Sequence, residues 1–349
     1  MVLSMVSRAV WLADDAQAMY NEIINLRPGR MPHSRKDNTT MIYAEHIQKV
    51  MDRTGFPEEA KACFNRVFDR IRSESALRKE YYALLNEYLY IDQELPLGKS
   101  LDKVTALAAK YGENQYTMHL AFILSCTPRM YELYEEEGID EEIYWESVID
   151  LRCKLLECME CKGVPGTFVG GWFNGWFRLA RFALGRFQYE PICYNFGLPV
   201  ELPNGEILQP GSPIANMHIP SSGVPLTDEV RNDSYRKAYN FLSKYFNTDK
   251  VFLCCSSWLL FGGHYEFLPE HSNILKFMND FHLTASVEKD NFGDNWRVYG
   301  HYADGPLEDL PEDSSLRRCY KKWLLDGKKT GSGWGCMLIK DGVNVTHKA

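Results

Sequence analysis

A histidine and a glutamate stand near the ends of two predicted strands, where either could move a proton. His218 lies in a short, mostly apolar run, and Glu190 closes a strand-like run that contains Arg186. An imidazole titrates near neutral pH and can take a proton from an attacking amine, while a carboxylate can act as base or orient that amine. Each also has a structural interpretation: His218 as a half-buried histidine bonded to backbone, Glu190 as an ion-pair partner of Arg186 or Arg181.

A polar loop follows the strand that carries His218 and leads into a predicted helix. The loop, residues 220–225, is rich in turn-forming residues, and the helix starts at Thr227 and ends near residue 246. A loop that directs backbone N–H groups from a helix start is suited to bind an anion such as a diphosphate. Two observations oppose this: the loop has no basic residue, and Asp228 and Glu229 already complement the helix dipole. An ordinary connection into the helix is the competing interpretation.

The next predicted strand, 251–260, is apolar almost throughout, which is typical of a strand covered on both faces. It contains Cys254 and Cys255, and His264 follows, so a thiolate nucleophile is conceivable. No glycine-framed nucleophile turn surrounds these residues, and a thiol hydrolase is the least favoured function. The ten cysteines follow no disulfide or metal-binding spacing, which predicts reduced thiols and no metal site.

The composition is that of a soluble globular protein and argues against two classes of partner. The formal net charge is −8 across 349 residues, whereas nucleic-acid binding needs clustered basic side chains. No apolar run approaches the length of a membrane span. Residues 1–12 lack a signal-peptide cleavage pattern and are interpreted as the start of an amphipathic helix, so we expect a cytoplasmic protein.

Helical periodicity fills the first part of the chain and gives way to strand signals where glycines and prolines cluster between 163 and 171. Apolar residues recur at helical spacing, most clearly in the segment 57–73. We predict an α+β protein: an all-helical domain over 1–165, a strand-rich α+β domain over 166–326, and a mobile glycine-rich tail over 327–349. The later part is expected to contain strands at 282–289 and 296–302 and a last helix at 314–326.

Several segments together resemble a known family. They are LGRFQYE (184–190), HIP (218–220) with PLT (225–227), SWLL (257–260), and SNI (272–274) followed by Phe277 and Phe281. Their order and spacing resemble a bacterial family of acyltransferases, whose members join an N-terminal helical domain to a C-terminal GNAT-like domain, named after the acyl-CoA N-acyltransferases. The resemblance implies a GNAT-like mixed sheet flanked by helices over 166–326. The resemblance covers most of the chain.

The resemblance implies that two strands splay apart to hold the pantetheine arm of acyl-CoA, and that the following loop binds its diphosphate. It places His218 beside the thioester and makes the segment 251–257 the second strand of the splay. It implies catalytic roles for His218 and Glu190, contacts with CoA for Ile219, Ser221, Ser222, Gly223 and Ser257, and contacts with the acceptor for Arg186, Tyr189, Trp258 and Asn273.

The function expected on this basis is transfer of an acyl group, acetyl included, from acyl-CoA to an amine or hydroxyl. The acceptor is expected to be a small molecule or a peptide, with no nucleic acid, membrane or metal involved, and a homodimer is considered. The alternative is a ligand-binding protein that kept the GNAT-like shape and lost CoA binding. The neutral, acid-flanked loop favours that alternative.

Overall fold

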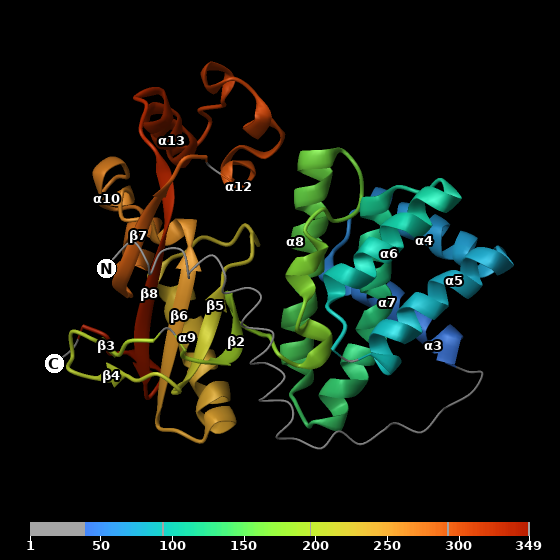
Figure 1. Ribbon diagram of the computed structural model, residues 1–349, viewed down its shortest axis with the longest axis horizontal. Coiled ribbons are helices and arrows are strands. Elements are labelled where there is room, and N and C mark those ends of the chain that lie inside the picture. Colours follow the sequence, from blue (N-terminus) through green and yellow to red (C-terminus); the bar gives the residue numbers. More distant parts are fainter. Residues whose placement is uncertain (1–38, 93, 196, 292, 348–349) are drawn as a thin grey trace. The chain divides into compact units, whose positions relative to one another are not determined.

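The computed structural model describes residues 39–347 except 93, 196 and 292 (Figure 1). The amphipathic helices expected within residues 1–26 lie outside the described residues. The described chain divides into two compact units between Ala183 and Leu184. This boundary lies later than the expected one after residue 165, because the stretch that follows stays with the helical unit. There the amide of Thr167 donates a hydrogen bond to the Tyr116 carbonyl at 3.0 Å.

The first unit is built from helices. They are α3 (Thr39–Thr54), α4 (Glu58–Ser73), α5 (Ser75–Asn86), α6 (Leu97–Tyr111), α7 (Gln115–Glu136) and α8 (Glu141–Lys162), with a π-helical turn η1 (Glu87–Ile91) and 3-10 turns η2 (Gly170–Phe173) and η3 (Trp176–Arg178). Apolar residues at helical spacing form the core. Helix α4 is an example, since Phe64, Val67 and Ile71 are buried along one stripe, as the sequence predicts.

Helix α7 is continuous, although a break after Cys126 is the natural expectation from Pro128. A proline lacks the N–H that would bond to the carbonyl four residues earlier. The Thr127 hydroxyl supplies the missing donor, since its Oγ1 bonds to that carbonyl, on Leu124, at 2.7 Å. The helix therefore runs through the proline, and the residues around it are buried on all sides.

The second unit contains a mixed sheet with the strand order β1-β2-β5-β6-β8-β7. The strands are β1 (Phe182–Leu184), β2 (Phe187–Cys193), β5 (Pro213–His218), β6 (Lys250–Ser257), β8 (Thr330–Lys340) and β7 (His282–Lys289), with β9 (Val343–Asn344) on β8 and a separate hairpin of β3 (Val200–Glu201) and β4 (Ile207–Leu208). Strands β5 and β6 are parallel and are joined by helix α9 (Asp228–Phe246). The expected α+β architecture is confirmed.

Strand alternation gives this sheet two different faces. On one face, Ile214 and Phe252 pack with Leu208 of the β3–β4 hairpin. On the other face, Tyr189 lies against α9, where its hydroxyl is 3.0 Å from that of Ser234. The hairpin and the helix therefore cover opposite sides of the central strands.

Shorter elements follow β6 and complete the unit. They are η4 (Trp258–Leu260), α10 (His264–Phe267), α11 (Asn273–Met278), α12 (Asn295–Tyr299), η5 (Gly300–Asp304), η6 (Leu307–Asp309) and α13 (Ser315–Leu325). The strand expected at 296–302 is wrong, because this segment forms α12 and η5. Its apolar residues Val298 and Tyr299 pack on one side of a helical turn against Leu310 and Tyr320.

The mobile tail expected after residue 327 is also wrong. Strand β8 pairs with β6 on one side and β7 on the other, and residues 335–339 are buried. Its alternate glycines, which suggest flexibility in the sequence, serve close packing. A Cβ at Gly331 would lie 2.1 Å from the Val287 carbonyl oxygen, and one at Gly333 would lie 1.9 Å from that of Leu260. Only glycine allows the chain to pass so close.

Candidate active site

The two candidate bases lie in contact. Nε2 of His218 is 2.8 Å from Oε2 of Glu190, and their side chains are 16% and 22% exposed. An ionised carboxylate only accepts hydrogen bonds, so Nε2–H donates to Glu190 and the lone pair of the neutral imidazole lies on Nδ1. The pair has the form of a base oriented by a carboxylate, sheltered in the protein but open to solvent.

The strand register explains why these residues meet. Strands β2 and β5 are antiparallel, with Gln188 opposite His218 and Glu190 opposite Asn216. Residues directly opposite share a face, so His218, Asn216 and Glu190 form one polar group on the hairpin-covered face. The Asn216 amide nitrogen lies 3.3 Å from His218 Nε2. Asn216 is absent from the expected site, although its spacing of two residues from His218 on a strand was a usable signal.

The sheet opens next to this group. Strands β5 and β6 pair at Ala215↔Leu253 and Asn216↔Cys254, while β5 runs on to His218 and β6 to Ser257. Over these last residues β5 stays paired with β2, and β6 stays paired with β8. Beyond Asn216 the facing edges of β5 and β6 are therefore not joined by a ladder. The ladder between β5 and β6 thus ends at Asn216, as the expected splay requires.

The loop after β5 is exposed, as a ligand-binding loop must be. Ser221 and Gly223 are exposed and Ser222 is half-buried. Arg186 donates to this loop from the β1–β2 turn, with Nε 3.0 Å from the Val224 carbonyl oxygen. The loop has no basic residue of its own, but a guanidinium from another element lies against it.

The acidic first turn of α9 is partly neutralised. Thr227 caps the helix, and its Oγ1 accepts from the Val230 amide at 3.4 Å. The Asp228 carboxylate lies 2.9 Å from Nη2 of the buried Arg231, which reduces the repulsion that this carboxylate would exert on an anion. Glu229, the other acidic residue of this turn, is exposed.

The other expected ligand-binding residues do not join the His218 group. Tyr189 is fully buried on the α9 face. Ser257 is three residues after Cys254, an odd spacing on a strand, so it lies on the α9 face too. The Ser257 hydroxyl accepts from the Leu259 amide at 3.1 Å and caps η4. Trp258 packs against Tyr320 in a separate apolar cluster. Asn273 opens α11 and is half-buried there.

Ile219 is the one expected CoA contact that directly continues β5. It is half-buried and lies between His218 and the exposed loop. Its position is consistent with a contact to the pantetheine arm, and this assignment stays a prediction.

The thiols of Cys254 and Cys255 are not suited to nucleophilic catalysis. Each residue is 1% exposed, and burial raises the pKa of both thiols, that of Cys255 to about 12. A thiolate is the reactive form of cysteine, and burial in apolar surroundings disfavours it. The thiol hydrolase interpretation is therefore rejected.

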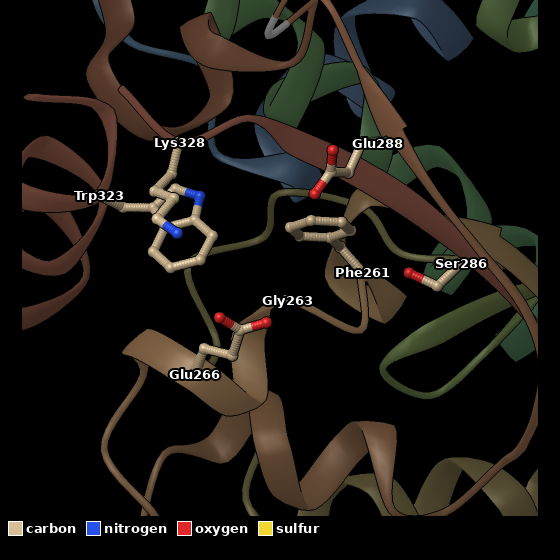
Figure 2. Close-up of a pocket in the computed structure, with 7 residues that line it drawn as sticks. All are labelled: Phe261, Gly263, Glu266, Ser286, Glu288, Trp323 and Lys328. Carbon is tan, nitrogen blue, oxygen red and sulfur yellow. The ribbon is translucent and has the colours of Figure 1, made fainter. Parts of the chain in front are cut away.

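A pocket of about 300 Å³ lies at the β7 edge of the sheet, which β6 and β8 separate from the strand β5 that carries His218. Figure 2 shows the residues that line it. Its walls come from the η4–α10 segment, from β7 and from the end of α13, and the lining residues are Phe261, Gly263, Glu266, Ser286, Glu288, Trp323 and Lys328. No expected site residue is among them. The pocket is therefore a separate surface feature.

Among the residues that the structure describes, no cluster of three or more His, Cys, Asp or Glu side chains is arranged to hold a metal ion. No helix in the same part of the chain is long and apolar enough to span a membrane. All ten cysteines are free thiols.

Two family models match the chain, one on each side of the boundary between the units. The N-acyltransferase N-terminal domain matches residues 45–179, and the GNAT-like C-terminal domain matches residues 181–337. Together these ranges cover most of the chain. Comparison with curated protein sequences gives no match.

Solved structures with the same fold include acyltransferases bound to acyl-CoA. An acyltransferase mutant in complex with octanoyl-CoA is 20% identical, covers 90% of each chain and has a TM-score of 0.65. An acyltransferase in complex with decanoyl-CoA and teicoplanin is 21% identical, covers 93% of this chain and 94% of its own, and has a TM-score of 0.66. The family and the enzyme class expected from the sequence are confirmed. This chain belongs to the acyltransferases that join an N-acyltransferase N-terminal domain to a GNAT-like C-terminal domain.

Proposed function

We propose that this protein transfers an acyl group from acyl-CoA to a primary amine of a small-molecule or peptide acceptor, with His218 as the base. The observation that carries the proposal is the His218–Glu190 pair, 2.8 Å apart at the point where β5 and β6 separate. A base in this position can reach a thioester held in the opening. The exposed loop that follows β5 can hold the diphosphate of the same ligand.

The reaction needs one proton to move from nitrogen to sulfur. The amine nitrogen attacks the thioester carbonyl carbon, the carbon–sulfur bond then breaks, and CoA leaves as a thiol. His218 takes the amine proton on Nδ1, while Glu190 stabilises the imidazolium through Nε2–H. The proton then passes to the leaving sulfur, so the pair returns to its starting state.

The opening between β5 and β6 can also stabilise the negative charge that develops on the thioester carbonyl oxygen during the reaction. Backbone N–H groups on the unjoined strand edges can bond to the carbonyl oxygen as it gains negative charge. These N–H groups are held rigidly because β5 stays paired with β2 and β6 stays paired with β8. They therefore need little rearrangement as the reaction proceeds.

The choice of donor and acceptor follows from the family and its relatives. An N-acyltransferase acts on an amine, which favours nitrogen over oxygen as the acceptor atom. The related crystal structures contain octanoyl-CoA, decanoyl-CoA and teicoplanin. We therefore include medium-chain donors and a glycopeptide amine in the test below, beside acetyl-CoA.

The test measures CoA binding and thiol release separately. We expect wild-type protein to bind CoA, and to release thiol from at least one of acetyl-, octanoyl- and decanoyl-CoA when an amine panel is supplied. His218→Asn should lower kcat by about 100-fold or more, the usual contribution of a general base, without changing the Kd for CoA. The matched control is His271→Asn, an exposed histidine of the same unit, which should behave as wild type.

Glu190→Gln isolates the orienting role. The amide keeps the size of the side chain but cannot stabilise the imidazolium by charge, so kcat should fall while CoA binding is kept. Glu270→Gln, at an exposed position, is its control. A wild-type protein that fails to bind millimolar CoA contradicts the proposal, and so does a His218→Asn variant that retains the wild-type rate.

A further inference from the structure

The turn between β1 and β2 reaches the loop that follows β5. Arg186 lies in this turn and donates to two loop carbonyls, from Nε to Val224 at 3.0 Å and from Nη1 to Pro220 at 2.7 Å. Both bonds are charge-assisted, because a guanidinium stays protonated in proteins. One side chain thus ties together the beginning and the end of the exposed part of the loop.

Helix α9 fixes the turn from which Arg186 extends. The buried hydroxyl of Ser234 donates to the Leu184 carbonyl at 2.6 Å and accepts from the Phe187 amide at 3.2 Å. Between them, Gly185 has a φ of +75°, and a Cβ there would be 3.2 Å from the Cα of Ser234. The turn therefore sits directly on the helix, and Arg186 starts from a fixed position.

A second arginine holds the C-terminal end of the loop. Nη1 of Arg231 donates to the Leu226 carbonyl at 2.6 Å, and the Arg231 side chain is 5% exposed. A trans peptide directs its carbonyl and its N–H in opposite directions. The N–H groups of Ser221 and Thr227 therefore point away from the arginines that bind the carbonyls of Pro220 and Leu226.

We propose that Arg186 is a positioning residue for the acyl-CoA diphosphate. It holds the loop by the carbonyls of Pro220 and Val224, and behind the first of these the N–H of Ser221 is directed to the ligand; Pro225, which follows the second, has no N–H. It also adds a positive charge beside a loop that has none of its own, which offsets the acidic start of α9. The inference rests on the proposed function, because it takes the loop as the diphosphate site.

The test compares two thioester donors of the same acyl chain. One is the acyl-CoA that wild type uses, and the other is the acyl-pantetheine, which lacks the diphosphate. Arg186→Met should raise KM for acyl-CoA about tenfold, the loss of one charge-assisted hydrogen bond or more, and leave kcat at saturation unchanged. KM for acyl-pantetheine should be the same in variant and wild type.

Two further variants separate positioning from general destabilisation. Arg186→Lys keeps the charge but presents its donors from a single nitrogen, so it cannot match both carbonyls as the separate Nε and Nη1 of the guanidinium do. Its KM for acyl-CoA should therefore lie between those of wild type and Arg186→Met. Arg236→Met removes an exposed arginine of α9 that pairs with Asp233, and should leave both KM values unchanged. Melting temperatures of all variants show whether each is folded.

The outcomes distinguish the two proposals. If Arg186→Met leaves KM for acyl-CoA unchanged, or raises KM equally for both donors, the positioning role is overturned while the enzyme's activity stands. If wild-type protein binds no CoA, the proposed function fails and this inference fails with it. A tenfold rise in KM for acyl-CoA, with KM for acyl-pantetheine unchanged, supports both proposals.

Discussion

The glycines of β8 give the sharpest test of how closely the segment that follows β6 packs on the sheet. Residues 258–261 pass over β8 directly after β6 ends, and the chain comes so close that a Cβ at Gly333 would lie 1.9 Å from the Leu260 carbonyl oxygen and 2.6 Å from its carbon. The expected consequence of Gly333→Ala is a large loss of stability. The neighbouring strands prevent β8 from moving aside, because Gly333 is paired with Ser257 on β6 and with Ser286 on β7.

The size of the loss follows from the contact. Non-bonded carbon atoms ordinarily lie about 3.5–4.0 Å apart, so the Leu260 backbone must retreat by roughly 1 Å or more. Overpacking a core costs about 1–3 kcal/mol when side chains can adjust, and more when backbone must move. The entropic gain of about 0.4–1 kcal/mol from replacing a glycine does not offset this. We expect the free energy of unfolding to fall by about 3 kcal/mol.

The assay is urea unfolding of the full chain, with a graded series of variants. Gly335→Ala should be milder than Gly333→Ala, because its Cβ would meet the Phe281 Cβ at 3.0 Å. Gly293→Ala is the matched control, since no atom lies within 4 Å of the added methyl group. If Gly333→Ala unfolds within about 0.5 kcal/mol of wild type, the range of an ordinary surface substitution, the close approach of η4 to β8 is refuted.

Three further predictions concern buried groups. Arg231→Met should lower the free energy of unfolding by about 3 kcal/mol in urea denaturation, because the Asp280 carboxylate, 2.6 Å from Arg231 Nε, loses its cation. An unchanged midpoint of the urea unfolding curve would contradict this. Burial lowers the pKa of His264 from 6.5 to about 4, so the unfolded state binds the proton first and stability falls as pH drops from 6.5 towards 4. His264→Gln should remove up to about 3 kcal/mol of that fall in unfolding experiments at each pH, and an identical pH slope would count against it. Cys254 and Cys255 should resist Ellman's reagent in the folded protein, since both are 1% exposed, and labelling on mixing would show that β6 is open.

Local signals in the sequence were sufficient to predict several elements. The helix expected to begin at Thr227 is α9, and Thr227 is its N-cap. The strand expected at 282–289 is β7, residue for residue. In both cases the signal lies within the segment itself, as a capping residue or as alternation bounded by turn residues. The helical first unit was predictable for the same reason, because its apolar stripes repeat at 3.6 residues.

Features that depend on distant parts of the chain could not be predicted in this way. His218 and Glu190 are 28 residues apart, and their contact follows from the register of β2 against β5. No local pattern fixes that register, so the sequence identified the two residues but not the pair. Strand β8 was missed because its glycines favour flexible chain, and the atoms that require them, the carbonyls of Leu260 and Val287, lie far away in the sequence.

The same dependence on surroundings underlies the proposal that His218, rather than the buried His264, acts as the base. His264 is completely buried among the rings of Trp258, Phe261 and Tyr320, and this burial holds its pKa near 4. A group held neutral in an apolar cluster cannot readily accept a proton from a substrate. His218 instead lies 2.8 Å from the Glu190 carboxylate, and its side chain remains 16% exposed. The proposed role needs a partner for the positive charge of the imidazolium and access to the substrate, and both are present at the end of β5.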